Sequence, residues 1–260
     1  NEVTNELVLS DMDVMNVEIP EGVQAIGWKA FYNRPLTSVH FAKSVQEIGH
    51  YAFASCKNLK SVNLPDSVTR IGMCAFFDCE SLEKVVLPNQ LQQIEAYTFR
   101  NCSMKSLEIP GKILIIGPGA FSECKQLEQV KLNTGLTKID VYAFHGCLAL
   151  ANINFPEGLV SIGEGTFGEC QNLRRVILPD SLQLIGEYTF YKCNLSILRF
   201  PPKLYFLIYD NKKGYIVYPH AKDRKHFSYD SVDTVIFSGS DYDFGYPAIT
   251  DAKNVYFLGK

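Results

Sequence analysis

Apolar positions recur with a fixed period along most of this chain. An isoleucine marks each period, at spacings of 22 or 23 residues, in the series Ile26, Ile48, Ile71, Ile94, Ile116, Ile139, Ile162 and Ile185. A period of this length is typical of a solenoid, in which each repeat buries its apolar face only against its neighbours. The pattern therefore predicts one elongated stack of turns.

Two further apolar positions follow each isoleucine. A phenylalanine stands five residues later in every turn, and a cysteine stands three residues after that in every turn but the first, where Arg34 replaces it. In the turn that begins at Ile48 these residues are Phe53 and Cys56. The spacing favours one face of a short α-helical or 3₁₀ turn, which is too brief to be stable unless neighbouring turns cover it.

An alternating segment comes next in each turn. Residues 59–64 read Leu-Lys-Ser-Val-Asn-Leu, and the two-residue step from Val62 to Leu64 is a strand signal. Pro65 follows directly, and a residue without a backbone N–H ends a strand ladder. Each turn is thus predicted to hold one short parallel strand and one short helical or irregular return.

The whole repeat resembles a known family. Its motif Leu-x-x-Val-x-Leu-Pro-x-x-Val-x-x-Ile-Gly-x-x-Ala-Phe-x-x-Cys is similar to the BspA-type leucine-rich repeat and fits residues from about 14 to 207. The resemblance implies an α/β solenoid, a right-handed, curved stack of 22–23-residue turns. It also implies cell-surface or secreted proteins of host-associated bacteria and some protozoa, mostly adhesins or modules of larger surface proteins. It implies no catalytic residue.

The chain is expected to have three parts. Residues 1–13 are interpreted as an N-terminal cap that covers the first turn, residues 14–207 as the leucine-rich repeat solenoid, and residues 208–260 as divergent repeats that continue the stack. In the last part, apolar runs at 204–209 and 215–218 predict a hairpin. Residues 235–237 and 255–257 are interpreted as two degenerate repeat strands.

Composition limits the partners. A net charge of −3, from 25 basic and 28 acidic residues, gives no electrostatic reason to expect nucleic acid. No apolar run approaches the roughly 18 residues that a membrane span requires. The chain begins at Asn1 without an apolar leader, which fits a removed signal peptide or a shortened chain. We expect a monomer that is secreted or displayed on the cell surface.

The cysteines do not indicate a disulfide framework. Eight cysteines in a secreted protein usually would, but seven of them share one repeat position. A disulfide needs Cα atoms within roughly 7 Å, and turns are generally spaced more widely on the return side. We therefore expect a ladder of reduced, buried thiols. Cys74 lies outside the ladder, as a packing residue or a free thiol.

No motif predicts chemistry. The sequence contains no phosphate loop, no nucleophile motif, no Cys-x-x-Cys and no histidines at metal-ligand spacing. We expect no catalytic residue, no metal and no cofactor.

Aromatic residues mark the return segments. Trp28, the only tryptophan, is interpreted as a packing residue of the first turn rather than a contact residue for a partner. The position three residues after the isoleucine is Lys29 in the first turn and then alternates between tyrosine and a small residue, in the series Tyr51, Cys74, Tyr97, Gly119, Tyr142, Gly165 and Tyr188. Each tyrosine is predicted to lean over its small neighbour. An aromatic binding strip is the functional alternative.

The outward side chains of the predicted strands are the candidate binding site. Strands stacked at roughly 4.8 Å would align nine such positions in a ribbon about 40 Å long. The candidate residues of this strand-face ribbon are Glu18, His40, Asn63, Lys84, Val86, Glu108, Lys131, Asn154, Arg175, Ile177 and Arg199.

Two functions are compatible with the sequence. One is a non-catalytic, adhesin-like interaction module that binds a host or matrix protein, with carbohydrate a less favoured partner. The other is a structural spacer in a larger surface protein that carries an anchoring or carbohydrate-active domain. An enzyme would need converging acid and base residues, which the sequence does not provide.

Overall fold

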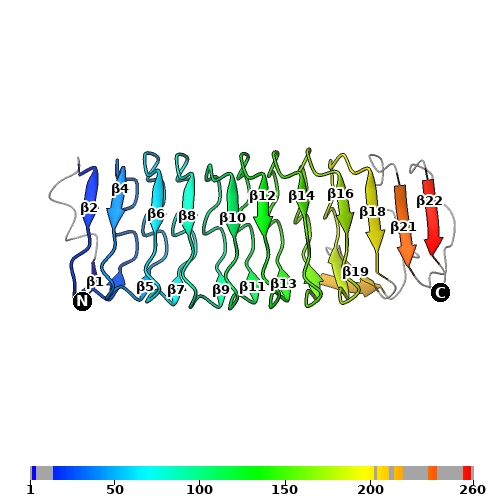
Figure 1. Cartoon of the computed structure of the whole chain (residues 1–260), viewed down its shortest axis with the longest axis horizontal. Helices are drawn as coiled ribbons and strands as arrows, with labels where there is room; N and C mark the ends of the chain where they lie inside the picture. Colours follow the sequence, from blue (N-terminus) through cyan, green and yellow to red (C-terminus); the bar gives the residue numbers. More distant parts are fainter. Residues whose placement is uncertain are drawn as a thin grey trace.

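The protein is a solenoid of parallel strands with about eight turns of about 23 residues. Figure 1 shows the turns side by side along one axis, with the first and last strands at opposite ends. The computed structural model describes the backbone of residues 2–3, 14–201, 204–210, 214–218, 234–238 and 254–258, and the side chains of residues 14–201 and 204. The handedness of the coil stays a prediction.

One side of the stack is built from the strands that the alternating pattern predicted. These strands are β2 (Asn16–Glu18), β4 (Ser38–His40), β6 (Ser61–Asn63), β8 (Lys84–Val86), β10 (Ser106–Glu108), β12 (Gln129–Lys131), β14 (Asn152–Ile153), β16 (Arg175–Ile177) and β18 (Ile197–Phe200). All of their pairings are parallel, and the ladder is interrupted between β4 and β6 and between β8 and β10. This side is called the strand face below.

A second row of strands, which the sequence did not predict, runs along the other side. It consists of β3 (Ala25–Ile26), β5 (Glu47–Ile48), β7 (Arg70–Ile71), β9 (Gln93–Ile94), β11 (Ile115–Ile116), β13 (Lys138–Ile139), β15 (Ser161–Ile162) and β17 (Leu184–Gly186). Most contribute two residues, of which only the isoleucine points inward, so there is too little alternation for a strand to be recognised. This side is called the short-strand face below.

Of the two forms that the sequence left open for the return, helical and irregular, the helical one is not found in the turns that the structure describes. Within the described residues no α-helix or 3₁₀-helix occurs, and each return is a series of turns. Two of its residues have left-handed backbone, Tyr51 with φ 56° and Ser55 with φ 61° in one turn, and a right-handed helix does not tolerate them. The Phe53 N–H donates to the Ala75 oxygen of the next turn at 2.8 Å, which binds the turns to one another.

Stacked phenylalanines form the centre of the core. Neighbouring rings lie 5.0 to 5.8 Å apart between centroids, with interplanar angles of 14° or less. The members of this ladder are Phe31, Phe53, Phe76, Phe99, Phe121, Phe144, Phe167 and Phe190. Offset stacking of this kind adds to the burial of large apolar area, so the ladder stabilises every interface between turns.

The cysteine ladder lies beside it, and all eight cysteines are free and buried, as predicted. The seven thiols of the ladder each donate to the carbonyl of the phenylalanine one turn back, at 3.0 to 3.3 Å. Phe53 O accepts two hydrogen bonds, one from the Cys56 N–H and one from the Sγ–H of Cys79 in the next turn, both at 3.2 Å. The thiol thus satisfies the second lone pair of a buried carbonyl.

The glycine that follows the isoleucine in six of the eight turns permits close approach of adjacent turns. A Cβ on Gly49 would lie 2.7 Å from Ile26 O, and one on Gly163 would lie 2.4 Å from Val141 N. Neither glycine has a positive φ, so contact between backbones explains the preference for glycine.

The last described strands extend both sides. β19 (Tyr205–Asp210) pairs antiparallel with β20 (Gly214–Tyr218), and β19 adds to the short-strand face. β21 (Thr234–Ser238) and β22 (Asn254–Leu258) add in parallel to β18. At the other end β1 (Glu2–Val3) pairs with β3, while residues 4–13 of the expected cap lie outside the described residues. The boundary expected at residue 207, between the leucine-rich repeat solenoid and the divergent repeats, stays a prediction.

Candidate functional site

The strand-face ribbon is a surface of aligned, mostly exposed side chains. Parallel register places Glu18 beside His40 and Glu108 beside Lys131. We call the outward positions that run from Glu18 to Arg199 the central column. Lys84 and Arg175 belong to the neighbouring column, two residues before the central position of their own strands. Nine of the eleven ribbon residues are exposed, and the other two, Ile177 and Arg199, are half-buried. The predicted residues therefore share one face, which Figure 1 shows as a continuous row of arrows.

Ion pairs neutralise part of the charge on the ribbon. Lys131 Nζ lies 2.5 Å from Glu108 Oε1, and Arg199 Nη2 lies 3.1 Å from Asp180 Oδ1. Within the part of the chain whose side chains are described, Lys84 and Arg175 have no ion pair or side-chain hydrogen bond. These two cations are therefore available to a partner's negative charge.

A shallow depression of about 220 Å³ lies at the C-terminal end of the ribbon. Its lining includes Asn154, Phe155, Arg175, Ile177 and Arg199, and one carboxylate, that of Glu157. The depression is smaller than the pockets that usually hold a small-molecule ligand, but it has room for a side chain. Apolar surface beneath guanidinium and amide donors suits an acidic or polar side chain of a protein.

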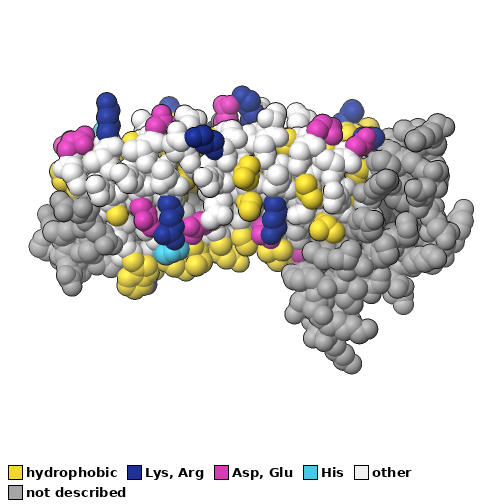
Figure 2. Space-filling model, turned by 90° about the horizontal axis from the view of Figure 1, so that it is seen from below, with side chains coloured by type: hydrophobic (Ala, Val, Ile, Leu, Met, Phe, Trp, Pro, Cys, Tyr) yellow, Lys and Arg dark blue, Asp and Glu magenta, His cyan; other side chains and the backbone are white. Residues whose placement is uncertain are grey.

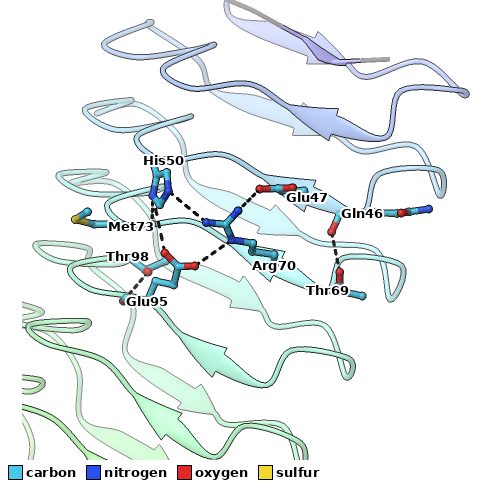
Figure 3. Close-up of polar contacts among 8 residues, drawn as sticks. All are labelled: Gln46, Glu47, His50, Thr69, Arg70, Met73, Glu95 and Thr98. Carbon is cyan, nitrogen blue, oxygen red and sulfur yellow. Dashed lines mark hydrogen bonds and ion pairs between the residues drawn. The ribbon is translucent and has the colours of Figure 1, made fainter.

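A second polar cluster lies on the short-strand face, and the sequence analysis missed it (Figure 3). Arg70 bridges two glutamates, Glu47 at 2.6 Å and Glu95 at 3.2 Å. His50 accepts a hydrogen bond from the Met73 N–H at Nδ1, 2.9 Å away, and its Nε2 lies 3.3 Å from Arg70 Nη2. The hydrogen bond to Glu95 raises the pKa of Arg70, and the charge of Glu47 acts in the same direction.

Glu95 was the signal that could have revealed this cluster. It replaces the glycine that follows the isoleucine in most turns, and its side chain is only 17% exposed. Asp140 is the other replacement, and it pairs with Lys138 at 2.7 Å. An acidic residue in place of the glycine that follows the isoleucine therefore indicates an ion pair on the short-strand face.

A groove of about 500 Å³ continues from this cluster between β7 and β11. Its lining is rich in amides and charges and includes Arg70, Gln90, Gln92, Glu95 and Lys112. Figure 2 views this side from below: charged clusters stand among hydrophobic side chains, and further hydrophobic side chains gather along the lower edge. The charges of the cluster are largely satisfied within the chain, so it stabilises neighbouring turns rather than presenting free charge.

The interpretation of Trp28 as a packing residue is wrong. Its side chain is 60% exposed, and Lys29 Nζ lies 4.5 Å from the centroid of its ring. Tyr32, also exposed, lies 5.1 Å from the same nitrogen. A cation over aromatic faces contributes attraction at an exposed site, so these residues hold one another without being buried.

The arrangement of tyrosines over small residues is confirmed. A Cβ on Gly119 would lie 2.3 Å from Tyr97 Cε1, and one on Gly165 would lie 2.3 Å from Tyr142 Cε1. Each ring therefore occupies the space above the next turn's glycine. The rings remain partly exposed, so packing and surface presentation are combined in the same residues.

The described residues carry no arrangement for catalysis by thiol or metal. Burial raises the pKa of Cys56, Cys124 and Cys193 to about 12, so these thiols stay protonated and are poor nucleophiles. Among the residues with described side chains, no group of three or more His, Cys, Asp or Glu could hold a metal ion. No helix in the described part of the chain is long and apolar enough to cross a membrane.

The family follows from comparison with known proteins. The model of the BspA type leucine rich repeat region matches six copies, over residues 5–117 and 92–211. The chain belongs to the BspA-type leucine-rich repeat family. Leucine-rich repeat proteins generally mediate protein–protein interactions, and their fold is generally non-catalytic.

Solved structures of bacterial leucine-rich repeat proteins are similar to this BspA-type chain. A leucine-rich repeat protein from Bacteroides ovatus shares 26% identity over 95% of this chain and 71% of its own, with a TM-score of 0.61. A leucine-rich repeat protein from T. pallidum shares 33% identity over 62% of this chain and 78% of its own, with a TM-score of 0.58. No curated protein matches the sequence.

Proposed function

We propose that this chain is a non-catalytic, adhesin-like module that binds an extracellular protein through its strand-face ribbon. The depression around Arg175 is the observation that carries the proposal. It combines a cation that has no ion pair within the described residues with half-buried apolar surface at Ile177. Such a site takes an acidic side chain flanked by apolar ones.

A surface location fits the same proposal. The BspA-type family resemblance implies secreted or cell-surface proteins, and an outward ribbon can meet a host or matrix protein only there. The ribbon also provides length, since its residues span strands β2 to β18. We place the protein outside the cell, as a monomer.

The second candidate is a structural spacer, and the ion pairs on the ribbon favour it. Lys131 and Arg199 already have partners in Glu108 and Asp180, as expected of a face selected only for solubility. A spacer would hold an anchoring or carbohydrate-active domain at a distance and would need no exposed binding residue.

Charge reversal at the depression separates the two functions. Purified extracellular-matrix proteins would be immobilised on a sensor surface, and the wild-type chain would be compared with Arg175→Glu. The matched control is Lys112→Glu, which makes the same charge change in the groove of the short-strand face. The binding module predicts capture that falls about tenfold or more in Arg175→Glu and is unchanged in the control. The spacer predicts no capture, or capture that Arg175→Glu leaves intact.

A further inference from the structure

The return segments present four tyrosines in one line. We call Tyr51, Tyr97, Tyr142 and Tyr188 the tyrosine strip. All four have the same left-handed backbone, with φ between 54° and 56°. Tyr97, Tyr142 and Tyr188 are 39%, 40% and 43% exposed, which is high for rings held in one repeat position. The strip lies outside the strand-face ribbon, since its residues belong to the returns.

The rings of the strip are held in place from below. Tyr97 covers Gly119 and Tyr142 covers Gly165, both at contact distance. The hydroxyl of Tyr142 lies 2.6 Å from Glu164 Oε1 in the next turn. Rings fixed in this way lose little conformational entropy when a ligand stacks on them, which favours binding.

The rings repeat at every second turn. Phe99, Phe121 and Phe144 give the spacing of the turns, with steps of 5.6 and 5.3 Å. Tyr97 and Tyr142 are therefore about 10–11 Å apart along the stack, roughly two strand spacings. The separation is too large for one compact side chain to contact two rings, but a linear polymer can contact them in sequence.

A column of polar side chains runs parallel to the tyrosine strip. It occupies the second left-handed position of the returns, four residues after the tyrosine position, and holds Ser55, Asp78, Asn101, Glu123 and Glu169, while Gly146 and Lys192 stand there in the turns of Tyr142 and Tyr188. Asn101 Nδ2 donates to Asp78 Oδ1 across the turn boundary at 3.0 Å. The Asn101 amide stands in the turn of Tyr97, and the carboxylates of Asp78, Glu123 and Glu169 stand in the turns between the rings. Amide and carboxylate oxygens can accept hydrogen bonds from hydroxyl groups.

We propose that the tyrosine strip binds an extended β-linked polysaccharide. The apolar C–H face of a pyranose stacks on an aromatic ring, and its hydroxyl edge meets the polar column. In an extended β-linked chain alternate sugars present the same face, and a pyranose unit is close in length to one strand spacing. Such a chain therefore repeats at the two-turn step of the rings.

A protein partner fits the strip less well. Protein interfaces concentrate binding energy in desolvated clusters whose centre is depleted of charge. Here the rings are separated by a full turn, and carboxylates accompany them. This surface is distinct from the depression at Arg175, so the two proposals are independent.

Titration calorimetry of the chain with cellohexaose and with chitohexaose tests the proposal. The test variant is Tyr97→Asn with Tyr142→Asn, because asparagine removes the ring and tolerates left-handed backbone. Tyr97→Phe with Tyr142→Phe keeps the rings, and Arg175→Glu leaves the strip intact. Urea midpoints within experimental error of wild type establish that each variant is folded.

We expect one or both hexasaccharides to bind the wild type, the phenylalanine variant and Arg175→Glu. The asparagine variant should bind about tenfold more weakly, as expected when two ring contacts are lost. Absence of binding to either hexasaccharide overturns the proposal, and so does equal binding by the asparagine variant. Loss of captured matrix protein in the asparagine variant, without sugar binding by the wild type, would assign the strip to a protein interface instead.

Discussion

The inside and the strand face of this solenoid follow opposite rules. Inside, the same residue types return in every turn: phenylalanine at one position and, after the first turn, cysteine at the next. On the strand face, the central column changes from Glu18 to Asn63 to Val86 to Lys131. Stacking requires each inward side chain to meet its own counterpart one turn away, whereas an outward side chain can meet solvent, a partner or, as Lys131 meets Glu108, a different residue type in the next turn. The inside therefore determines the fold, and the outside is free to determine binding.

Removing one ring of the phenylalanine ladder should have the largest effect. Phe121→Ala deletes a fully buried ring that stacks on both neighbours, at 5.6 and 5.3 Å. We expect a loss of about 3–5 kcal/mol in the free energy of unfolding, from lost burial and a cavity. Urea denaturation followed by circular dichroism measures it. A loss below ~1 kcal/mol would mean that the ladder does not hold the turns together.

The buried thiols should make stability depend on alkaline pH. Burial raises the pKa of Cys124 to about 12 in the folded chain, while an unfolded thiol titrates near its ordinary value. The folded state keeps its proton longer, so the stabilisation is fully present below about pH 8.5 and is lost as the pH rises toward 12.

One thiol contributes up to about 1.4 kcal/mol per pH unit in that window. Urea unfolding of wild type and Cys124→Ala at pH 8, 9, 10 and 11 isolates the contribution of this thiol, because lysine and tyrosine titration is common to both chains. The free energy of unfolding should fall less steeply with pH in the variant than in the wild type. Parallel curves would indicate that Cys124 ionises equally in both states.

The Arg70 cluster should contribute less to the free energy of unfolding than the phenylalanine ladder. Glu95→Gln keeps the shape of the side chain but removes the charge that pairs with Arg70 at 3.2 Å. Because Arg70 is about half exposed and keeps Glu47, we expect a loss of up to about 1 kcal/mol. The loss should shrink in 1 M salt. The same loss at low and high salt would show that packing, and not charge, holds this residue.

Ribbon substitutions should have the smallest effect on stability. Arg175→Glu changes an exposed side chain with no ion pair in the described residues, so the free energy of unfolding should change by no more than about 0.5 kcal/mol. Urea denaturation of this variant beside the wild type measures it. A larger loss would show that Arg175 supports the stack and would remove the reason for assigning it to binding.

The sequence predicts the inside well because the inside repeats. The positions of Ile48, Phe53 and Cys56 recur in later turns. An apolar residue that recurs at a fixed spacing is buried when it packs against the equivalent residues of the adjacent turns, so its position inside the stack can be predicted. The family assignment rests on the same recurrence. The sequence could not choose between a helical and an irregular return, because a spacing of five and then three does not reveal the positive φ of Tyr51 and Ser55.

The polar contacts between turns were not predicted. Arg70 meets Glu95 across 25 residues of sequence, and the only signal was the acidic residue at a position that is glycine in most turns. The exposure of Trp28 was missed for a related reason: its neighbours Lys29 and Tyr32 hold the ring from outside the core. The ribbon residues share a face as the alternation predicted, but their role in binding remains a proposal.

The division between a fold-determining inside and a freely varying strand face is tested most directly by one pair of urea denaturation curves. One variant is Phe121→Ala, and the other carries three changes on the ribbon, Lys84→Thr, Val86→Thr and Arg175→Thr. Threonine retains strand propensity at these exposed positions. We predict that the single core change lowers the free energy of unfolding by at least about 3 kcal/mol and the triple change by less than about 1 kcal/mol. A triple variant that unfolds at lower urea than Phe121→Ala would contradict the account.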